Sequence, residues 1–346
     1  MTTTQSTPRT FVLASRASQL AQIQTNSVLD TLQSIYADSD DQLQPKFTAS
    51  FMSTAGDKNQ SQALYLLGGK ALWTKELEVA LKEKVVDLLI HCLKDVPTTL
   101  PEGCALAAIL EREDPTDSLV VKSGKPWKSL DELPEGSVVG TSSVRRVAQL
   151  KRKYPHFKFL DVRGNLTTRL AKLDAPDGPY AALILAKAGL VRQGLGDRIN
   201  EDLNPPTLFY AVSQGALAVE VRSDDTEAIE LCKKLIHRDT EYRCLAERAC
   251  LRVLEGGCSV PVGVSTELRG DVLKFTGCVT SLDGVEHVQH TIEQTVTSTE
   301  EAEEVGRKLA RVLIETGAKK ILDDINVERE RRIIAAKAED EVREAS

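Results

Sequence analysis

Short apolar runs alternate with stretches of helical periodicity over the first two thirds of the chain. Between the runs, apolar residues recur at helical spacing, as in Trp73, Leu77, Leu81 and Val85. Strands that alternate with helices predict α/β units built around mainly parallel sheets. The runs with the length and content of strands are residues 11–14, 46–51, 85–90, 105–110, 118–121, 137–140, 157–160, 181–185 and 216–221.

The pattern changes after about Asp239. A long helical stretch covers residues 240–254 and is followed by alternating segments at 273–280 and 285–297. Alternation of this kind is typical of antiparallel strands with one buried face. A further helix is expected over residues 302–316, so this part of the chain predicts a small α+β domain.

Three of the apolar runs end in small hydrogen-bonding residues and arginine, directly before a helical pattern. Free N–H groups at a helix N-terminus favour anions, and the arginine fork binds a carboxylate or phosphate through two hydrogen bonds. Carboxyl ends of parallel strands meet at one edge of a sheet, so the three segments predict a site for a polyanionic ligand. The segments are Ser15-Arg16-Ala17-Ser18, Thr141-Ser142-Ser143-Val144-Arg145-Arg146 and Arg163-Gly164-Asn165-Leu166-Thr167-Thr168-Arg169.

Composition restricts the class of protein. With 41% hydrophobic and 27% charged residues the chain is typical of globular proteins, and its net charge of −7 argues against a nucleic-acid partner. No apolar run reaches the length of a membrane span, and the polar first ten residues resemble no secretory signal. Seven cysteines without a CxxC pair suit a reducing compartment, so a cytoplasmic protein without a membrane partner is expected.

Asp95 is a candidate for chemistry. It follows Lys94 at the exit of an expected buried strand, with Pro97 stiffening the next turn. A surface Lys–Asp pair that caps the turn is one interpretation. The other is a lone carboxylate in a cationic cleft, where it would stay ionised and stabilise a developing cation.

Cys258 is the second candidate. Gly256 and Gly257 precede it and Pro261 follows, as in an exposed loop that presents a thiol. Most free cysteines are buried packing residues, but this setting favours a nucleophile or an attachment point. No metal site is expected, because His287 and His290 have no cysteine or acid at ligand spacing.

The order and spacing of these motifs resemble the porphobilinogen deaminase family from about residue 11 to residue 325. The shared segments are Ala-Ser-Arg-Ala-Ser (14–18), Gly-Gly-Lys-Ala-Leu-Trp-Thr-Lys-Glu-Leu-Glu (68–78), His-Cys-Leu-Lys-Asp-Val-Pro (91–97), Gly-Thr-Ser-Ser-Val-Arg-Arg (140–146), Arg-Gly-Asn-Leu-Thr-Thr-Arg-Leu (163–170), Gln-Gly-Ala-Leu-Ala-Val-Glu (214–220) and Glu-Gly-Gly-Cys (255–258).

The resemblance implies three domains and a covalent cofactor. The first two would be α/β domains like those of periplasmic binding proteins, with a cleft between them, and the third a small α+β domain that carries the cysteine loop. The cofactor would be dipyrromethane on Cys258, and the protein a monomer. The expected domains are residues 10–114 with 213–236, residues 115–212 and residues 237–325, followed by a charged tail over 326–346 that is either a solvated helix or disordered.

The implied reaction joins four porphobilinogen units, each with an acetate and a propionate, and releases ammonia. Asp95 would be catalytic, because the reaction passes through cationic pyrrole nitrogens. Arg16, Ser18, Arg169 and Arg192 would bind substrate. The residues expected to hold the cofactor are Cys258, Lys94, Thr141, Ser142, Ser143, Arg145, Arg146, Arg163, Gly164 and Gln214.

Two other classes remain open. A bilobed solute receptor or sensor also needs arginines, but it would usually carry a secretory signal or a DNA-binding motif and has no use for the cysteine loop. An acyl transferase could form a different adduct at Cys258 but would want a histidine base, and none lies in that motif. A dipyrrole mass on the Cys258 peptide would decide among the three.

Overall fold

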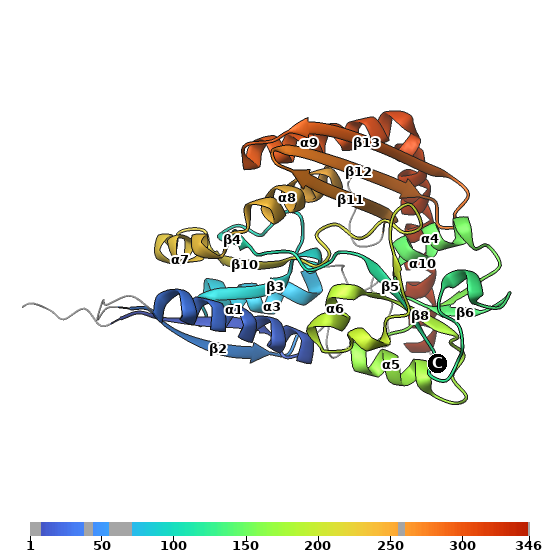
Figure 1. Ribbon diagram of the computed structural model, residues 1–346, viewed down its shortest axis with the longest axis horizontal. Coiled ribbons are helices and arrows are strands. Elements are labelled where there is room, and N and C mark those ends of the chain that lie inside the picture. Colours follow the sequence, from blue (N-terminus) through green and yellow to red (C-terminus); the bar gives the residue numbers. More distant parts are fainter. Residues whose placement is uncertain (1–7, 38–43, 55–70, 255–259, 345–346) are drawn as a thin grey trace, which may run out of the picture.

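Three sheets organise the chain (Figure 1). The structure is a computed structural model that describes residues 8–37, 44–54, 71–254 and 260–344. Cys258 and the segment at 55–70, which includes the start of the Gly-Gly-Lys motif, lie outside the described residues.

The first sheet has five strands in the order β2-β1-β3-β10-β4. Alternate residues of β1 point to opposite faces: Phe11 and Leu13 pack with helices α1 and α7, whereas Ala14 packs with helix α3. Both faces are therefore covered by helices. The bounds are β1 Thr10–Arg16, β2 Lys46–Met52, β3 Leu88–Cys92, β4 Cys104–Ile109, β10 Leu217–Arg222, α1 Gln19–Ala37, α3 Ala71–Lys82 and α7 Thr226–Cys232.

The second sheet repeats this layout in the order β7-β6-β8-β5-β9. Leu119 and Val121 pack with α4 on one face, while Val120 packs with α5 and α6 on the other. Each face again buries alternate residues of the same strands. The bounds are β5 Asp117–Val121, β6 Val138–Gly140, β7 Lys158–Leu160, β8 Ala182–Ala186, β9 Glu201–Leu203, α4 Val144–Lys153, α5 Leu166–Asp174 and α6 Lys187–Arg192.

One strand of each sheet runs against the other four. β10 is antiparallel to β3 and β4, and β5 is antiparallel to β8 and β9. Each reversed strand follows a segment that crosses from the other sheet, residues 110–116 before β5 and 204–216 before β10. Four of the five strands in each sheet run in the same direction, as the prediction of mainly parallel sheets requires. The reversed strand has a neighbour on each side, so half of the neighbouring pairs are antiparallel. Each reversed strand enters its sheet without a crossover helix.

The third sheet is antiparallel, in the order β11-β12-β13, and packs against helices α8 and α9. The two helices approach closely at Gly306, where an added Cβ would lie 2.0 Å from the carbonyl oxygen of Ala246. This confirms the predicted fold class of two α/β units and a small α+β unit. The bounds are α8 Arg238–Val253, β11 Val262–Arg269, β12 Val272–Thr280, β13 His287–Thr295 and α9 Thr299–Leu313.

Some expected elements differ from those observed. Val85 was expected to begin a buried strand, but it is 65% exposed in the turn between α3 and β3, next to Lys84 at φ 60°. The sequence pattern also missed β9 and β11. At the end of the chain, α10 (Lys319–Glu344) spans the expected start of the charged tail as one helix. None of the helices in the described part combines the length and apolar character that a bilayer span needs.

Candidate functional site

Charged residues of both α/β units gather at the carboxyl ends of their strands. Lys94 and Asp95 lie in the short helix η2 (Leu93–Asp95) that directly follows β3 of the first sheet. Arg146 and Arg169 lie in the helices that follow β6 and β7 of the second sheet. Lys94 interacts electrostatically with Asp95 and Arg146, and Arg169 with Arg146 and Asp95, so these groups share one region.

The positive charges of this region are poorly compensated. Burial lowers the pKa of Lys94, and the charge of Arg146 adds to that effect. Burial, together with the charges of Arg146 and Arg163, lowers the pKa of Arg169 to about 10. Burial also lowers the pKa of Arg192. A bound carboxylate would be a favourable partner for such partly desolvated cations.

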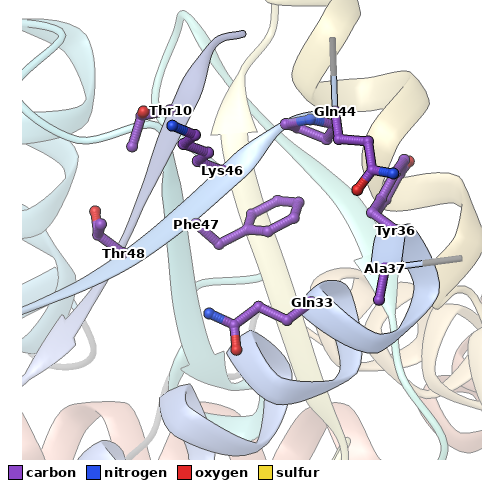
Figure 2. A pocket seen from close by; sticks show the side chains of 9 residues that line it. Thr10, Gln33, Tyr36, Ala37, Gln44, Lys46, Phe47 and Thr48 are labelled. Carbon is purple, nitrogen blue, oxygen red and sulfur yellow. The ribbon is translucent and has the colours of Figure 1, made fainter. Parts of the chain in front are cut away.

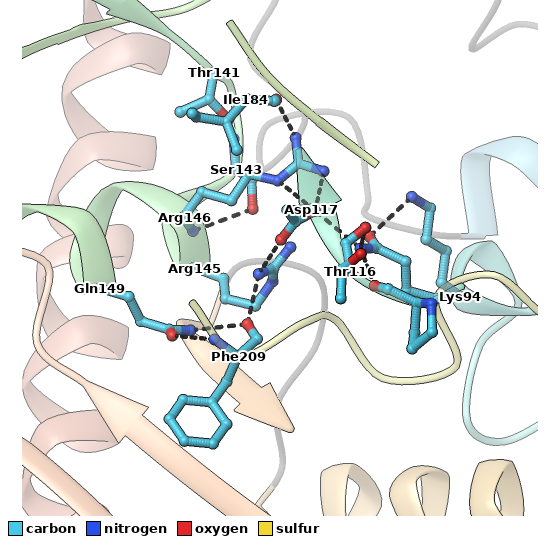
Figure 3. Close-up of polar contacts among 12 residues, drawn as sticks. Lys94, Thr116, Asp117, Thr141, Ser143, Arg145, Arg146, Gln149, Ile184 and Phe209 are labelled. Atoms are coloured by element: carbon cyan, nitrogen blue, oxygen red, sulfur yellow. Dashed lines mark hydrogen bonds and ion pairs between the residues drawn. The ribbon is translucent and has the colours of Figure 1, made fainter. Parts of the chain in front are cut away.

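Arg145 and Arg146 converge on Asp117, the first residue of β5 (Figure 3). Arg146 donates from Nε and Nη2 to Oδ1 of Asp117 at 3.1 and 2.7 Å, and Arg145 donates from Nη1 to Oδ2 at 2.7 Å. Arg145 also donates to the carbonyl of Phe209 at 2.7 Å. Burial alone would raise the pKa of the Asp117 carboxyl, but the two guanidinium groups hold it well below its usual range. The sequence pattern gave no indication of this role for Asp117, which directly follows the charged segment 111–116.

The three hydroxyl residues before α4 organise the turn. Ser143 is the N-cap of α4 and accepts a hydrogen bond from the backbone of Arg146. Thr141 Oγ1 accepts from the backbone of Ser143 at 3.3 Å, and Ser142 donates to the carbonyl of Val162 at 2.9 Å. Ser18 has a similar place at the start of α1, where its Oγ accepts from the backbone of Ala21 at 3.4 Å. All these contacts are within the protein, so the ligand-binding roles expected of Thr141, Ser142, Ser143 and Ser18 stay predictions.

Gly164 shapes the turn between β7 and α5. Its φ of +111° is in the region that favours glycine, and an added Cβ would lie 2.8 Å from Cγ2 of Thr168. Its carbonyl accepts a hydrogen bond from Nε of Arg169 at 2.8 Å, which orients that guanidinium. The carbonyl of Arg163 accepts from Nζ of Lys172 at 2.9 Å.

Gln214 and Arg192 meet the segments that cross between the sheets. The buried amide of Gln214 accepts from Nζ of Lys94 at 3.3 Å and donates to Oδ1 of Asp117 at 2.8 Å. Arg192 donates to the carbonyl of Gly215 at 2.7 Å. Gln214 thus connects Lys94, a predicted cofactor residue of the first unit, to Asp117, which binds Arg145 and Arg146 in the second unit.

Two further predicted residues belong to the first sheet, Arg16 at the end of β1 and Asp95 directly after β3. The guanidinium of Arg16 lies 4.1 Å from the ring centre of Trp73, a cation–π contact. Asp95 is half-buried, and its carboxylate accepts no hydrogen bond from a described residue. It is therefore accessible to a reacting group.

A pocket of about 420 Å³ lies elsewhere, at the amino ends of β1 and β2 (Figure 2). It is lined by the side chains of Tyr36, Lys46 and Phe47 among others, and by no predicted site residue. Within the described ranges, no cluster of His, Cys, Asp and Glu has the arrangement of a metal site.

Fold and site together place cations from two α/β units around the half-buried carboxylate of Asp95, an arrangement suited to a ligand with several carboxylates. The sequence model described as porphobilinogen deaminase, dipyromethane cofactor binding domain, matches residues 11–230, and the model of the C-terminal domain of porphobilinogen deaminase matches residues 241–315. The chain belongs to the porphobilinogen deaminase family, which confirms the family predicted from its motifs.

Curated relatives agree over nearly the whole length. Porphobilinogen deaminase of Yarrowia lipolytica is 48% identical over 93% of this chain and 94% of its own. The enzyme of Nostoc sp. is 50% identical over 93% and 97%, and that of Saccharomyces cerevisiae 47% over 93% and 99%. A substrate-binding domain of an amino acid ABC transporter from Streptococcus pneumoniae has a TM-score of 0.38 at 12% identity, over 70% of this chain and 93% of its own, a likeness too slight to carry an argument.

The family is one of transferases in tetrapyrrole synthesis, and its cofactor is dipyrromethane, as predicted. The donor set of the site fits this group. A dipyrrole with four carboxylates requires several cations, and half-buried Lys94 and Arg169 have lowered pKa values that a bound anion would raise.

Proposed function

We propose that the chain is a hydroxymethylbilane synthase, which joins four porphobilinogen units head to tail and releases one ammonia with each. The observation that carries this proposal is the gathering of cations from both sheets around the accessible carboxylate of Asp95. When bound to Cys258, the dipyrromethane cofactor supplies the terminal pyrrole carbon to which the first new unit is joined.

Different cations would neutralise the acetate and propionate groups of the cofactor and those of the incoming substrate. Arg145, Arg146, Arg163, Lys94 and Gln214 would hold the cofactor, helped by Gly164 and by Thr141, Ser142 and Ser143 at the start of α4. Arg16, Ser18, Arg169 and Arg192 would hold the incoming substrate. Guanidinium groups suit this role because their planar fork binds a carboxylate through two hydrogen bonds.

Asp95 would act on the substrate as it loses ammonia. The bond between the aminomethyl carbon and nitrogen breaks, and the remaining electrophile carries positive charge on its pyrrole nitrogen. A carboxylate nearby stabilises that charge. The new carbon–carbon bond then forms, and the accepting ring carbon loses its proton. This proton balances the one that leaves with ammonia, so one carboxylate can handle both transfers.

The other two classes explain less of the molecule. A solute receptor needs the arginines but not an accessible acid beside them, and an acyl transferase does not need so many cations around one carboxylate. We further propose that the three units fold as domains with the boundaries given above, and that the protein is a cytoplasmic monomer.

Loss of the attachment point gives the direct test. Cys258→Ala should abolish turnover and remove the dipyrrole mass from the protein, because chain growth then has no primer. Intact-protein mass spectrometry and an assay of product from porphobilinogen measure both effects. Cys104→Ala, at a half-buried thiol on β4, is the control and should keep adduct and activity. Near-native turnover by Cys258→Ala would refute the attachment role, and an adduct of another mass would favour one of the rival classes.

A further inference from the structure

Asp117 is buried where the first crossing segment enters the second sheet. Its side chain is fully shielded from solvent, and both carboxylate oxygens accept hydrogen bonds from arginine. Oδ2 binds Arg145, while Oδ1 binds Nε and Nη2 of Arg146. Arg146 completes its contacts by donating from Nη1 to the carbonyl of Ile184 at 2.6 Å. The carboxylate thus determines the direction in which both guanidinium groups point.

The same oxygen also binds the second crossing segment. Gln214 donates from Nε2 to Oδ1 of Asp117 at 2.8 Å and to the carbonyl of Pro115 at 2.7 Å. Its Oε1 accepts from Nζ of Lys94 at 3.3 Å, and Lys94 is next to Asp95 in the chain. A continuous path therefore leads from Arg146 of the second sheet through Asp117 and Gln214 to the turn that carries Lys94 and Asp95.

The two crossing segments are also tied to each other along this path. The backbone N–H of Glu113 donates to the carbonyl of Gly215, and Nε of Arg112 donates to the carbonyl of Gln214 at 2.7 Å. An added Cβ at Gly215 would lie 2.3 Å from the carbonyl oxygen of Glu113, so the backbones are in close contact. The amide of Gln214 is consequently held at a defined distance from Asp117.

We infer that Asp117 is a positioning residue, which sets Arg146 and, through Gln214, Lys94 in the arrangement that receives the carboxylates of the cofactor and the growing chain. The inference rests on the proposed function. Asp117 itself touches neither ligand nor reacting atoms, because its oxygens are already occupied by protein donors. Its effect on the reaction is exerted through the residues that it orients.

Asp117 could instead serve only to neutralise charge, and the two roles predict opposite effects of its removal on the binding of anions. If the carboxylate only neutralised surplus positive charge, its removal would strengthen the attraction of the site for anions. If it positions the cations, its removal leaves them able to point elsewhere and weakens the binding of a carboxylate that needs two-point contacts. The sign of the change in cofactor loading therefore distinguishes the two roles.

The test compares Asp117→Asn with Asp114→Asn. Asp114 lies in the crossing segment that leads to Asp117 and pairs with Lys187, and its side chain is 36% exposed, so the control removes one negative charge without touching the arginines. For Asp117→Asn we expect the fraction of chains with the dipyrrole mass to fall by about tenfold, while KM for porphobilinogen and kcat of the loaded fraction stay within about twofold of wild type. Asp114→Asn should match wild type in all three.

A double-mutant cycle with Gln214→Met tests the path to Lys94. If Asp117 acts through Gln214, the double variant Asp117→Asn/Gln214→Met should carry the dipyrrole on no smaller a fraction of chains than Asp117→Asn alone. Should Asp117→Asn fail to fold, Gln214→Met decides the matter, because it cuts the path and leaves both Asp117–arginine pairs. It is then expected to lower the fraction of chains with the dipyrrole mass, with kcat of the loaded chains preserved.

The inference is overturned if folded Asp117→Asn loads cofactor as well as wild type, or better, or if Gln214→Met leaves cofactor loading unchanged. Wild-type protein that makes no tetrapyrrole would instead refute the proposed function. The two failures are therefore distinguishable.

Discussion

The two α/β sheets share one strand layout, but the carboxylates that they place at the candidate site differ in burial and in hydrogen-bond donors. In each sheet the strand next to the last edge is reversed and follows a crossing segment. Asp117 in the second sheet is buried and held by Arg145, Arg146 and Gln214. Asp95, at the end of β3 in the first sheet, is half-buried and accepts no hydrogen bond from a described residue.

This difference shows how one scaffold assigns two roles to the same side chain. A carboxylate whose lone pairs are taken by guanidinium groups holds its neighbours in place, and its charge is already compensated. A carboxylate without such donors keeps its charge for a cation that develops during a reaction. The surrounding donors therefore suit Asp117 to positioning its neighbours and, on the proposed function, leave the charge of Asp95 for chemistry.

Asp95→Asn should have the largest effect on this comparison. The amide keeps the shape but loses the charge, so we expect turnover to fall by about 10²-fold or more while the cofactor stays bound. Single-turnover kinetics and the intact mass measure the two properties. Glu102→Gln, an exposed carboxylate of the same unit, is the control and should retain activity. Unchanged single-turnover chemistry in Asp95→Asn would mean that Asp95 only caps its turn.

Arginine substitutions on the two sheets should differ in the stage that they affect. Arg146→Leu should yield protein without bound dipyrrole, whereas Arg16→Leu should keep the cofactor and stall elongation. Because Arg146 is paired with Asp117, its removal also leaves part of a buried charge uncompensated, and stability should fall by about 3 kcal/mol.

The mass ladder of enzyme-bound intermediates after a limited pulse of porphobilinogen measures this division, with thermal unfolding recorded alongside. Lysine at either position should rescue only partly, since an ammonium lacks the two-point fork. Normal cofactor loading in Arg146→Leu, or a wild-type ladder in Arg16→Leu, would overturn the assignment.

The smallest effect is expected for Asp225, which follows β10 at the end of the first sheet opposite to Asp95. Hydrogen bonds from Arg9, joined by Arg222, hold the pKa of its carboxyl well below the usual range. Asp225→Asn, which keeps the N-cap of α7, should lower the free energy of unfolding by about 1–2 kcal/mol and leave kcat and KM unchanged.

The pH dependence of that loss follows from the direction of the shift. A lowered pKa in the folded protein gives stability that is complete above the unfolded value, about 4, and is lost as the pH falls toward the folded value. Urea unfolding of wild type and Asp225→Asn should therefore differ by a constant amount above about pH 5 and converge below pH 4. A difference independent of pH would contradict the ion-pair explanation.

Most of the fold, and the helix starts at the candidate site, could be predicted from sequence because the signals are local. Period-two and helical patterns located β1, β12, α5 and α8, and small residues before a helix marked the turn at Thr141–Ser143 as a helix start. The same patterns failed for Val85 and for the short strand β9, where a turn and an edge pairing outweigh local preference.

Sequence by itself determined which side chains stand at the strand ends, and through its ordered motifs the family and the cofactor. Only the tertiary structure decided which of those side chains face one another. Arg145 and Arg146 look equivalent to free ligand-binding arginines in the sequence, yet both bind Asp117, which lies 28 and 29 residues earlier in the chain. Gln214, 97 residues beyond Asp117, connects them to Lys94. Such partnerships depend on two crossing segments that meet only in the folded molecule, where burial makes an uncompensated charge costly and so selects the pairs that form.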